Sequence, residues 1–226
     1  DKIIEICKQS GAQAVHPGYG FLSENTEFAE ALEANGITFI GPPSSAIASM
    51  GSKSAAKEIM SHASVPLVPG YHGDDQDPAL LKQESEKCGF PQLLKAVAGG
   101  GGKGMRLVTQ EEELESSFEM ARREGQNFFG NPACYIERFV QNPKHIEIQV
   151  FGDKKGNVVH LFERECSVQR RNQKLIEEAP SISVPDEVRE EMGKVAVKAA
   201  KSINYEGAGT IEFSGQNLLR LNREQM

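Results

Sequence analysis

The sequence predicts an α/β or α+β fold in which a larger body carries a smaller subdomain built around a β-hairpin. Strand-like and helix-like segments alternate over residues 1–63, a pattern typical of parallel sheets. Two further strand-like segments flank the glycines at positions 99–102, as the strands of a hairpin would. Apolar and polar residues then alternate over residues 145–153, the period of a half-buried strand.

Composition and charge restrict the protein to ordinary globular classes. Of its 226 residues, 38% are hydrophobic and 25% are charged, which is too apolar for a disordered chain. The net charge of −7 argues against nucleic acid or an acidic membrane as a partner. No apolar run approaches the ~20 residues of a membrane span. Asp1 opens directly into an amphipathic segment, which argues against a signal peptide.

Four cysteines are scattered along the chain without CxxC spacing: Cys7, Cys88, Cys134 and Cys166. This spacing predicts reduced, structural thiols in a cytosol-like compartment and disfavours a zinc site.

The first segments predict two strands of a parallel sheet with helices around them. Residues 1–10 place apolar side chains on one helical face, and Gly11 is suited to cap that helix. Residues 12–15 predict a short buried strand that ends in a Pro-Gly turn, and GITFIGPP predicts a second strand. Helices are expected over residues 23–34 and 45–63.

The middle of the chain predicts the hairpin subdomain. A short strand is expected at residues 65–70, followed by the polar loop GYHGDDQDP and a helix over residues 78–88. FPQLLKAV and MRLV predict the two hairpin strands, with the glycines between them. A helix over residues 110–125 follows.

The last third predicts four strands and one long helix. The segments ACYIERFV, HIEIQVFGD and VVHLFEREC are strand-like, and GAGTIEF predicts the final strand. The helix before it begins at Ser183 or Asp186 and continues to about Ile203.

The four consecutive glycines need a local reason, because glycine loses more backbone entropy on folding than any other residue. The flanking strands and the absence of serine disfavour a flexible linker. Gly104 follows Lys103 where a P-loop needs Ser or Thr, and MRLV is strand-like where a dinucleotide fingerprint needs a helix. A glycine hairpin that covers phosphates is therefore favoured over a plain tight turn, with backbone N–H groups and Lys103 supplying positive potential.

Longer motifs around this loop resemble one family. These motifs are HPGYGFLSEN, FIGPPSSAI, KAVAGGGGKGM, IERFV, NPKHIEIQVFGD, ERECSVQRRNQKLIEEAP and GAGTIEF. They resemble the biotin carboxylase component of biotin-dependent acyl-CoA carboxylases, over nearly the whole chain until about Phe213. GYHGDDQDP is similar to the methylcrotonyl-CoA carboxylases, while RRNQK and EEAPSI are similar to the propionyl-CoA type.

The resemblance implies an ATP-grasp fold, in which two subdomains grip ATP and the glycine loop is the lid. Residues 1–51 would be the C-terminal part of the family's N-terminal domain, a truncated parallel α/β unit. Residues 52–140 would form the linker and lid subdomain. Residues 141–226 would form the C-terminal ATP-grasp subdomain, also truncated.

The resemblance also implies an activity, namely that of an ATP-dependent ligase that carboxylates biotin. In the family, bicarbonate attacks the γ-phosphate of ATP, and the resulting carboxyphosphate breaks to CO₂ and phosphate beside the biotin ureido nitrogen. The implied cofactors and substrates are ATP, Mg²⁺ or Mn²⁺, bicarbonate and biotin on a carrier domain. The implied partners are a biotin carboxyl carrier domain, a carboxyltransferase subunit and, at full length, a second copy. The implied location is the mitochondrial matrix or a bacterial cytoplasm.

Nine positions match the family's ATP site: Lys53, Lys95, Gly100, Gly101, Gly102, Met105, Glu137, Val140 and His145. The two lysines match those that contact the nucleotide phosphates. Glu137 and Val140 match the adenine-binding hinge, and Met105 would pack on the ring. Taken alone, Met105 and Val140 would more often be plain core residues.

Five further positions match the reaction end of the family's site: Gln169, Lys174, Tyr19, Gly20 and Glu212. Gln169 and Lys174 match the catalytic phosphate and bicarbonate end, and Tyr19 and Gly20 match the biotin side. Glu212 matches the first Mg²⁺ carboxylate, and a buried-facing strand glutamate is costly unless it is paired or metal-bound. Many members carry histidine where Asn172 stands, so that contact is expected to differ here.

After Phe213 the sequence departs from the family's pattern. The family continues with a second metal carboxylate and EMNTRxQVEHP, whereas this chain reads SGQNLLRLNREQM. The leading hypothesis is that the chain is a biotin carboxylase. The alternative is a truncated, catalytically impaired ATP-binding remnant of that family, and the lack of the second metal carboxylate and of EMNTRxQVEHP favours this alternative. A third hypothesis is another ATP-grasp ligase, such as half of a carbamoyl-phosphate synthetase, against which QRRNQK and HPGYGFLSEN argue.

Overall fold

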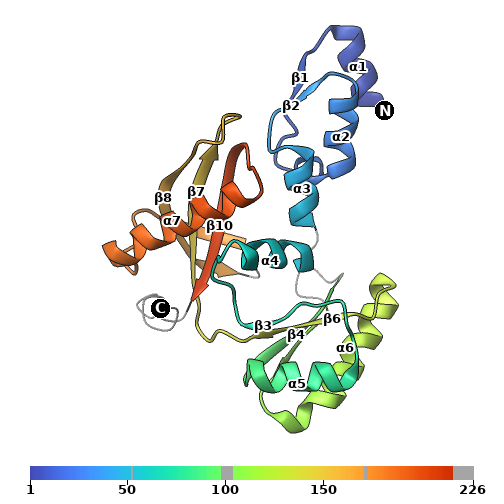
Figure 1. Ribbon diagram of the computed structural model, residues 1–226, viewed down its shortest axis with the longest axis vertical. Coiled ribbons are helices and arrows are strands. Elements are labelled where there is room, and N and C mark those ends of the chain that lie inside the picture. Colours follow the sequence, from blue (N-terminus) through green and yellow to red (C-terminus); the bar gives the residue numbers. More distant parts are fainter. Residues whose placement is uncertain (52, 98–103, 171–172, 216–226) are drawn as a thin grey trace.

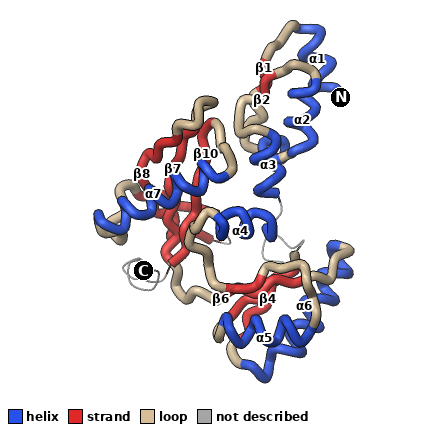
Figure 2. Tube along the Cα trace, viewed as in Figure 1, coloured by secondary structure: helices blue, strands red, loops and turns tan. Residues whose placement is uncertain are grey.

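The computed structural model describes residues 1–51, 53–97, 104–170 and 173–215, and they form three sheets with separate hydrophobic cores (Figures 1 and 2). The mixed α/β class that the sequence predicts is confirmed. The parallel pairing that the sequence predicts is present between the first two strands. The other strand pairs of the described residues are antiparallel.

The N-terminal unit is a two-stranded parallel sheet with helices packed against it. Its elements are α1 (Lys2–Ser10), β1 (Ala14–Val15), η1 (Phe21–Glu24), α2 (Thr26–Ala34), β2 (Thr38–Phe39) and α3 (Ser44–Gly51). Gly11 caps α1 with a left-handed φ of 72°, as the sequence predicts. The prediction that the first strand is buried is wrong, because Ala14 is exposed and Val15 only half-buried. The core of this unit lies under α1, α2 and α3 instead.

The second sheet has the strand order β3-β6-β4-β5 and is antiparallel throughout. Its elements are β3 (Gly70–Tyr71), α5 (Pro78–Cys88), β4 (Gln92–Ala96), β5 (Met105–Val108), η2 (Glu111–Glu113), α6 (Leu114–Phe129) and β6 (Cys134–Arg138). The pairing of β4 with β5 confirms the predicted hairpin. Helices α5 and α6 cover one face of the sheet (Figure 1), and Leu94 and Ile136 are fully buried there.

The strand predicted at residues 65–70 is wrong in its bounds, because only Gly70 and Tyr71 form β3. Proline has no backbone N–H, and Pro66 and Pro69 therefore cannot donate hydrogen bonds to a neighbouring strand. The carbonyl of Pro69 still accepts a hydrogen bond from Arg138 N at 2.8 Å. The sheet thus gains one short edge strand in place of a longer one.

The third sheet has the order β10-β7-β8-β9 and is also antiparallel. Its elements are β7 (Lys144–Gly152), β8 (Val158–Arg170), β9 (Gln173–Glu178), α7 (Asp186–Ser202) and β10 (Gly207–Gly215). Ile146, Ile148 and Val150 of β7 pack with α7, so the predicted period of two along this strand is confirmed. The alternate residues of β7 therefore lie on the face away from α7.

Strand β9 is missing from the sequence-based prediction. All six of its residues are exposed, and it lies at the sheet edge. A strand without an apolar face carries no period-two signal, so only its pairing with β8 reveals it.

Helix α4 (Lys53–His62) lies between the second and third sheets in Figure 1. It contacts α7 of the third sheet, and its Lys57 reaches Glu137 of the second. Residues 139–143 connect β6 with β7 and so join the two sheets. None of the described helices combines the length and the hydropathy of a membrane span.

All four cysteines are buried and free, in agreement with the prediction of reduced structural thiols. Burial raises the pKa of the Cys134 thiol to about 11, which keeps it protonated at neutral pH.

Candidate functional site

The second sheet presents a polar face opposite the one covered by α5 and α6. Buried and half-buried residues alternate along β4, so Lys95 projects away from the Leu94 side. The antiparallel register pairs Lys95 with Met105 on β5 and with Tyr135 on β6. Glu137 is two residues beyond Tyr135 and shares its face of β6. Three of the predicted ATP-site residues, Lys95, Met105 and Glu137, therefore lie on one face of this sheet.

Glu137 is the centre of a cationic cluster on that face. Its Oε1 accepts a hydrogen bond from Lys57 Nζ at 2.7 Å and lies 3.0 Å from His72 Nε2, while its Oε2 accepts from Lys95. Burial acts to raise the pKa of Glu137, but hydrogen bonds from His72, Lys57 and Lys95 outweigh it and hold the pKa well below its usual range. Two ammonium groups thus contact one carboxylate that is ionised at neutral pH.

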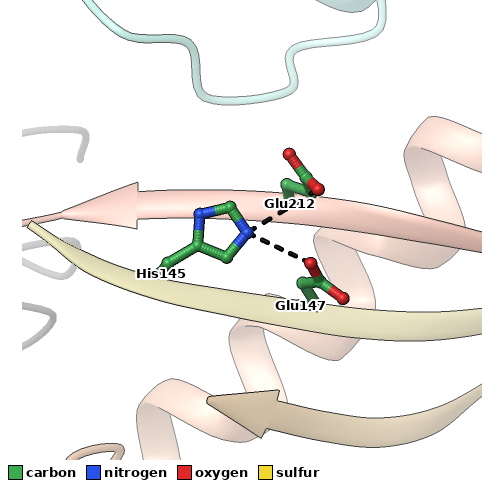
Figure 3. Close-up of side chains that lie close together, drawn as sticks. All are labelled: His145, Glu147 and Glu212. Atoms are coloured by element: carbon green, nitrogen blue, oxygen red, sulfur yellow. Dashed lines mark hydrogen bonds and ion pairs between the residues drawn. The ribbon is translucent and has the colours of Figure 1, made fainter. Parts of the chain in front are cut away.

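The third sheet carries a second polar cluster on the face of β7 that turns away from α7. His145 and Glu147 are two residues apart and share this face, and Glu212 on β10 lies directly opposite Glu147 in the register. Figure 3 shows the three side chains converging from β7 and β10. His145 Nε2 lies 3.1 Å from Glu147 Oε1 and 3.6 Å from Glu212 Oε1.

The carboxylates of Glu147 and Glu212 face each other across strands, which is destabilising for like charges. Two cations offset this repulsion. Lys174 of β9 donates to Glu147 and lies 3.2 Å from Glu212 Oε1. Arg164 of β8 reaches Glu147 Oε2 at 2.6 Å. The carboxylate of Glu147 is only 1% exposed, and these partners provide the pairing that a buried charge needs.

A cleft of about 1050 Å³ lies between the N-terminal unit and the third sheet. Its lining includes Tyr19, in the turn after β1, and Glu212 of β10. Tyr19 is fully exposed, and its ring centroid lies 5.9 Å from that of His16, which also lines the cleft. The cleft joins the predicted biotin side to the predicted metal carboxylate.

The donor set of the second cluster suits a hard divalent cation in part. Ligand atoms of His145, Glu147 and Glu212 all lie within 4.8 Å of one another. Carboxylate oxygens are the ligands that Mg²⁺ prefers. The Lys174 ammonium contacts both carboxylates, however, so it already supplies positive charge at this point.

The other predicted positions are distributed as follows. Gln169 lies opposite Lys174 in the β8–β9 pairing, and its Nε2 donates to Cys166 O at 2.7 Å. Val140 is half-buried in the connection between the two sheets. Gly20 adjoins Tyr19 as the residue that precedes η1. Lys53 is the first residue of α4, within the span 45–63 that the sequence predicts to be helical.

Several of the residues that the sequence singles out lie outside the described residues, namely Gly99, Gly100, Gly101, Gly102, Lys103 and Asn172. A backbone hydrogen bond joins the two hairpin strands next to the glycine run, where Ala96 N donates to Gly104 O at 2.8 Å. Gly104 has a φ of 71°, a conformation that glycine adopts without strain.

One expectation about burial is wrong. Glu212 was expected to face inward, but its side chain is 55% exposed, because it lines the open cleft. The buried carboxylate of the site is Glu147, the residue opposite it in the sheet.

Sequence reasoning missed Glu147, Arg164, Lys57 and His72. For Glu147 a signal existed, since it follows His145 by two residues in an alternating strand and must share its face. For Arg164 no local signal existed, because the pairing of β7 with β8 decides its position. Lys57 and His72 reach Glu137 across 80 and 65 residues of sequence, which no local pattern encodes.

Comparison with known families agrees with this arrangement. Residues 52–221 match the family described as carbamoyl-phosphate synthase L chain, ATP binding domain. Residues 1–47 match the biotin carboxylase N-terminal domain.

The individual proteins that this chain resembles are carboxylase subunits or biotin carboxylases. The chain is 59% identical over 213 residues to the mitochondrial methylcrotonoyl-CoA carboxylase subunit alpha of Dictyostelium discoideum, covering 94% of this chain and 30% of that protein. The biotin carboxylase of Campylobacter jejuni, solved as a β,γ-ATP complex, has a TM-score of 0.86 and 47% identity, covering 96% of this chain and 49% of that one.

A third relative is the biotin carboxylase domain of Hydrogenobacter thermophilus 2-oxoglutarate carboxylase, solved with MgADP, ADP and bicarbonate. It has a TM-score of 0.83 and 51% identity, covering 94% of this chain and 47% of that one. The chain thus spans about a third to a half of the length of these relatives. The ATP-grasp fold is confirmed, and the chain belongs to the biotin carboxylase family, in which a biotin carboxylase N-terminal domain precedes an ATP-binding domain of the carbamoyl-phosphate synthase type.

Proposed function

We propose that this chain carries out the ATP- and bicarbonate-dependent carboxylation of biotin, as part of an acyl-CoA carboxylase. The observation that carries the proposal is that each of two connected sheets has a lysine–carboxylate cluster. Lys95 contacts Glu137 on the second sheet, and Lys174 contacts Glu147 and Glu212 on the third. Residues 139–143 connect the two sheets. The related structures solved with MgADP, bicarbonate or a β,γ-ATP ligand support it.

The nucleotide would lie between the two sheets. Lys95 and Lys53 would neutralise the phosphates, and glycines 100–102 would cover them with backbone N–H groups. Met105 shares a cross-strand pair with Lys95, which supports its proposed contact with the adenine ring. Glu137 and Val140 would form the hinge side of the adenine pocket, with His145 at the start of β7 near the phosphates.

The reaction end would lie on the third sheet. Glu212 and the neighbouring His145 and Glu147 would hold Mg²⁺ or Mn²⁺, which neutralises the charge of the polyphosphate. Lys174 and Gln169 are opposite each other in the β8–β9 pairing, where an ammonium and an amide can bind and orient an anion such as bicarbonate. Tyr19, which lines the cleft, and the adjoining Gly20 would face biotin.

The identity of the relatives supports the wider assignments. A biotin carrier domain and a carboxyltransferase subunit are the proposed partners, and a second copy is the proposed partner in a dimer. A mitochondrial matrix or a bacterial cytoplasm is the proposed location, since the relatives include a mitochondrial subunit and a bacterial enzyme. We also propose the division 1–51, 52–140 and 141–226, which the three separate cores support.

The test measures whether ATP cleavage requires bicarbonate. The chain is incubated with MgATP, free biotin and ¹⁸O-labelled bicarbonate, and ADP and phosphate are analysed. Attack of bicarbonate on the γ-phosphate predicts bicarbonate-dependent ADP release with ¹⁸O in the phosphate. Lys174→Met should reduce the rate by about 10²–10³, the cost of losing one electrostatic contact to the reacting groups.

Other results would separate the competing functions. ADP release that does not depend on bicarbonate, or phosphate without ¹⁸O, would contradict carboxyphosphate formation. Tight MgATP binding without turnover would favour the remnant, which the comparisons do not favour. Turnover that requires ammonia would favour a carbamoyl-phosphate synthetase.

A further inference from the structure

Helix α4 contributes a lysine, Lys57, to which the proposed chemistry gives no role. Its ammonium lies 2.7 Å from Glu137 Oε1, and it also contacts His72 Nε2. The side chains of Lys57, His72 and Glu137 are 23%, 11% and 15% exposed. A surface lysine would be more exposed, and a loop histidine has no general reason to be this buried.

The two oxygens of Glu137 have different partners. Oε1 is held by Lys57 and His72, and Oε2 accepts from Lys95. Fixing one oxygen of a carboxylate fixes the other, so the position of Lys95 depends on the groups at Oε1. Two ammonium groups therefore share one carboxylate.

These contacts also tie together elements that are far apart in sequence. Lys57 lies on α4, one helical turn after Lys53, and His72 directly follows β3. Glu137 is on β6, opposite Gly70 of β3. The His72 ring packs on Tyr135, with 5.3 Å between the ring centroids, which fixes the ring against the same sheet face. The cluster thus connects α4 to the sheet that carries Lys95.

We propose that Lys57 and His72 are positioning residues for the nucleotide site. They hold Glu137, which in turn orients Lys95 and ties α4, the helix that begins at Lys53, to the second sheet. The proposal rests on the proposed ATP site. It assigns a role to the histidine of the GYHGDDQDP loop, which neither the ATP contacts nor the reaction end uses.

The test compares ligands with and without the outer phosphates. Dissociation constants for MgATP and AMP are measured by calorimetry for the wild-type chain, Lys57→Met, Lys57→Arg and His72→Gln. Lys57→Met should weaken MgATP binding by about tenfold, the worth of a hydrogen bond to a charged group, and AMP binding by less than about twofold. His72→Gln should act in the same direction. Lys57→Arg should restore MgATP binding, because arginine can still donate to Glu137.

The matched control is Lys82→Met, which removes an exposed lysine 3.4 Å from Glu111 and should leave both affinities unchanged. A coupling measurement separates positioning from general stability: in a Lys95→Met background, Lys57→Met should have little further effect on MgATP binding. Additive effects, or equal losses for AMP and MgATP, would overturn the positioning role.

Failure of the two proposals can be told apart. A wild-type chain that does not bind MgATP contradicts the proposed function, and this inference falls with it. A wild-type chain that binds MgATP while Lys57→Met and His72→Gln bind it equally well contradicts the inference alone. Circular dichroism identifies a variant that is unfolded, and in that case the other variant decides.

Discussion

Glu147 shows how a single buried charge can organise several strands. It lies on β7, and its carboxylate is shared by Lys174 from β9, Arg164 from β8 and His145 on its own strand. Arg164 also donates to Gln149 and Thr210, each at 3.1 Å, which extends the network to β10. A buried carboxylate with several donors is costly to neutralise, because its partners then lose their shared anion.

The first prediction concerns this charge. Glu147→Gln keeps the shape of the side chain but leaves Arg164 and Lys174 without their main anion, so it should lower the free energy of unfolding by about 3 kcal/mol. Urea denaturation at pH 7 measures the change. Glu177→Gln is the control, since that exposed carboxylate is 3.8 Å from Arg164 and should cost less than about 0.5 kcal/mol. Equal effects of the two substitutions would contradict the assigned role.

The second prediction concerns Glu165, on the opposite side of β8 from Arg164. Burial acts to raise its pKa, but hydrogen bonds from Ser181, Lys144 and Ser167 lower it from 4.5 to about 2. A pKa that is lower in the folded state stabilises the protein above the unfolded value, and this stabilisation is lost as the pH falls toward the folded value. Glu165→Gln should therefore cost about 2 kcal/mol at pH 7.

The pH dependence is the specific signature of that charge. The difference in unfolding free energy between the wild type and Glu165→Gln should decrease steadily between pH 5 and pH 3, as measured by urea denaturation. A difference that stays constant over this range would indicate lost packing instead of a lost charge.

At the scale of elements, the second and third sheets position their polar residues in the same way. In each, alternate residues of a central strand bury an apolar row against helices and present a polar row to the site, as Leu94 and Lys95 do on β4 and Ile146 and Glu147 on β7. The apolar row stabilises the strand, so the polar row is held by packing on the other side.

The third prediction concerns the edge strand β3, which needs a glycine. A Cβ at Gly70 would lie 2.1 Å from the Ile136 carbonyl oxygen and 2.9 Å from Glu137 Cα, both backbone atoms that cannot rotate away. Gly70→Ala should therefore lower the free energy of unfolding by about 1–3 kcal/mol, as overpacking does. It should also weaken MgATP binding, because Gly70 of β3 pairs directly with Glu137 of β6.

The matched control is Gly51→Ala at the end of α3, where a Cβ would meet nothing within 4 Å. Its effect on the urea midpoint and on MgATP affinity should be small. A Gly70→Ala protein as stable as Gly51→Ala would show that β3 can move away from β6 at little cost.

At the scale of the molecule, three hydrophobic cores are distributed along the chain. One lies in the N-terminal unit and includes Cys7, the second lies under α5 and α6 and includes Cys88 and Cys134, and the third lies under α7. Separate cores open with separate free energies, so a ligand stabilises most strongly the parts that it contacts.

The fourth prediction uses the buried cysteines as probes of these cores. In pulsed thiol labelling read by mass spectrometry, MgATP should slow the labelling of Cys88 and Cys134 in the core beneath the polar face of Lys95. It should leave Cys7 in the N-terminal core nearly unchanged. Equal protection of all three thiols would indicate that the chain opens as a single cooperative unit.

The sequence by itself determined the features that depend on neighbouring residues. Asp77 caps α5 by accepting from the N–H groups of Ala79 and Leu80, and the predicted helix over residues 78–88 is confirmed because Asp before Pro is a local start signal. The alternation of β7 and the hairpin around the glycines were predictable for the same reason. Motifs that resemble the family also predicted site roles for Lys95, Met105, Glu137, His145, Lys174 and Glu212, and these roles stay predictions.

Only the tertiary structure decided which of these residues meet and which others join them. The register of β10, β7 and β8 places Glu212, Glu147 and Arg164 side by side, and it makes Glu147 the buried carboxylate and Glu212 the exposed one. The edge pairing with β8 creates β9, and packing of α4 and the loop after β3 brings Lys57 and His72 to Glu137. The physical reason is that a side-chain period is a property of one strand, whereas register and long-range contacts arise from packing between segments far apart in the chain.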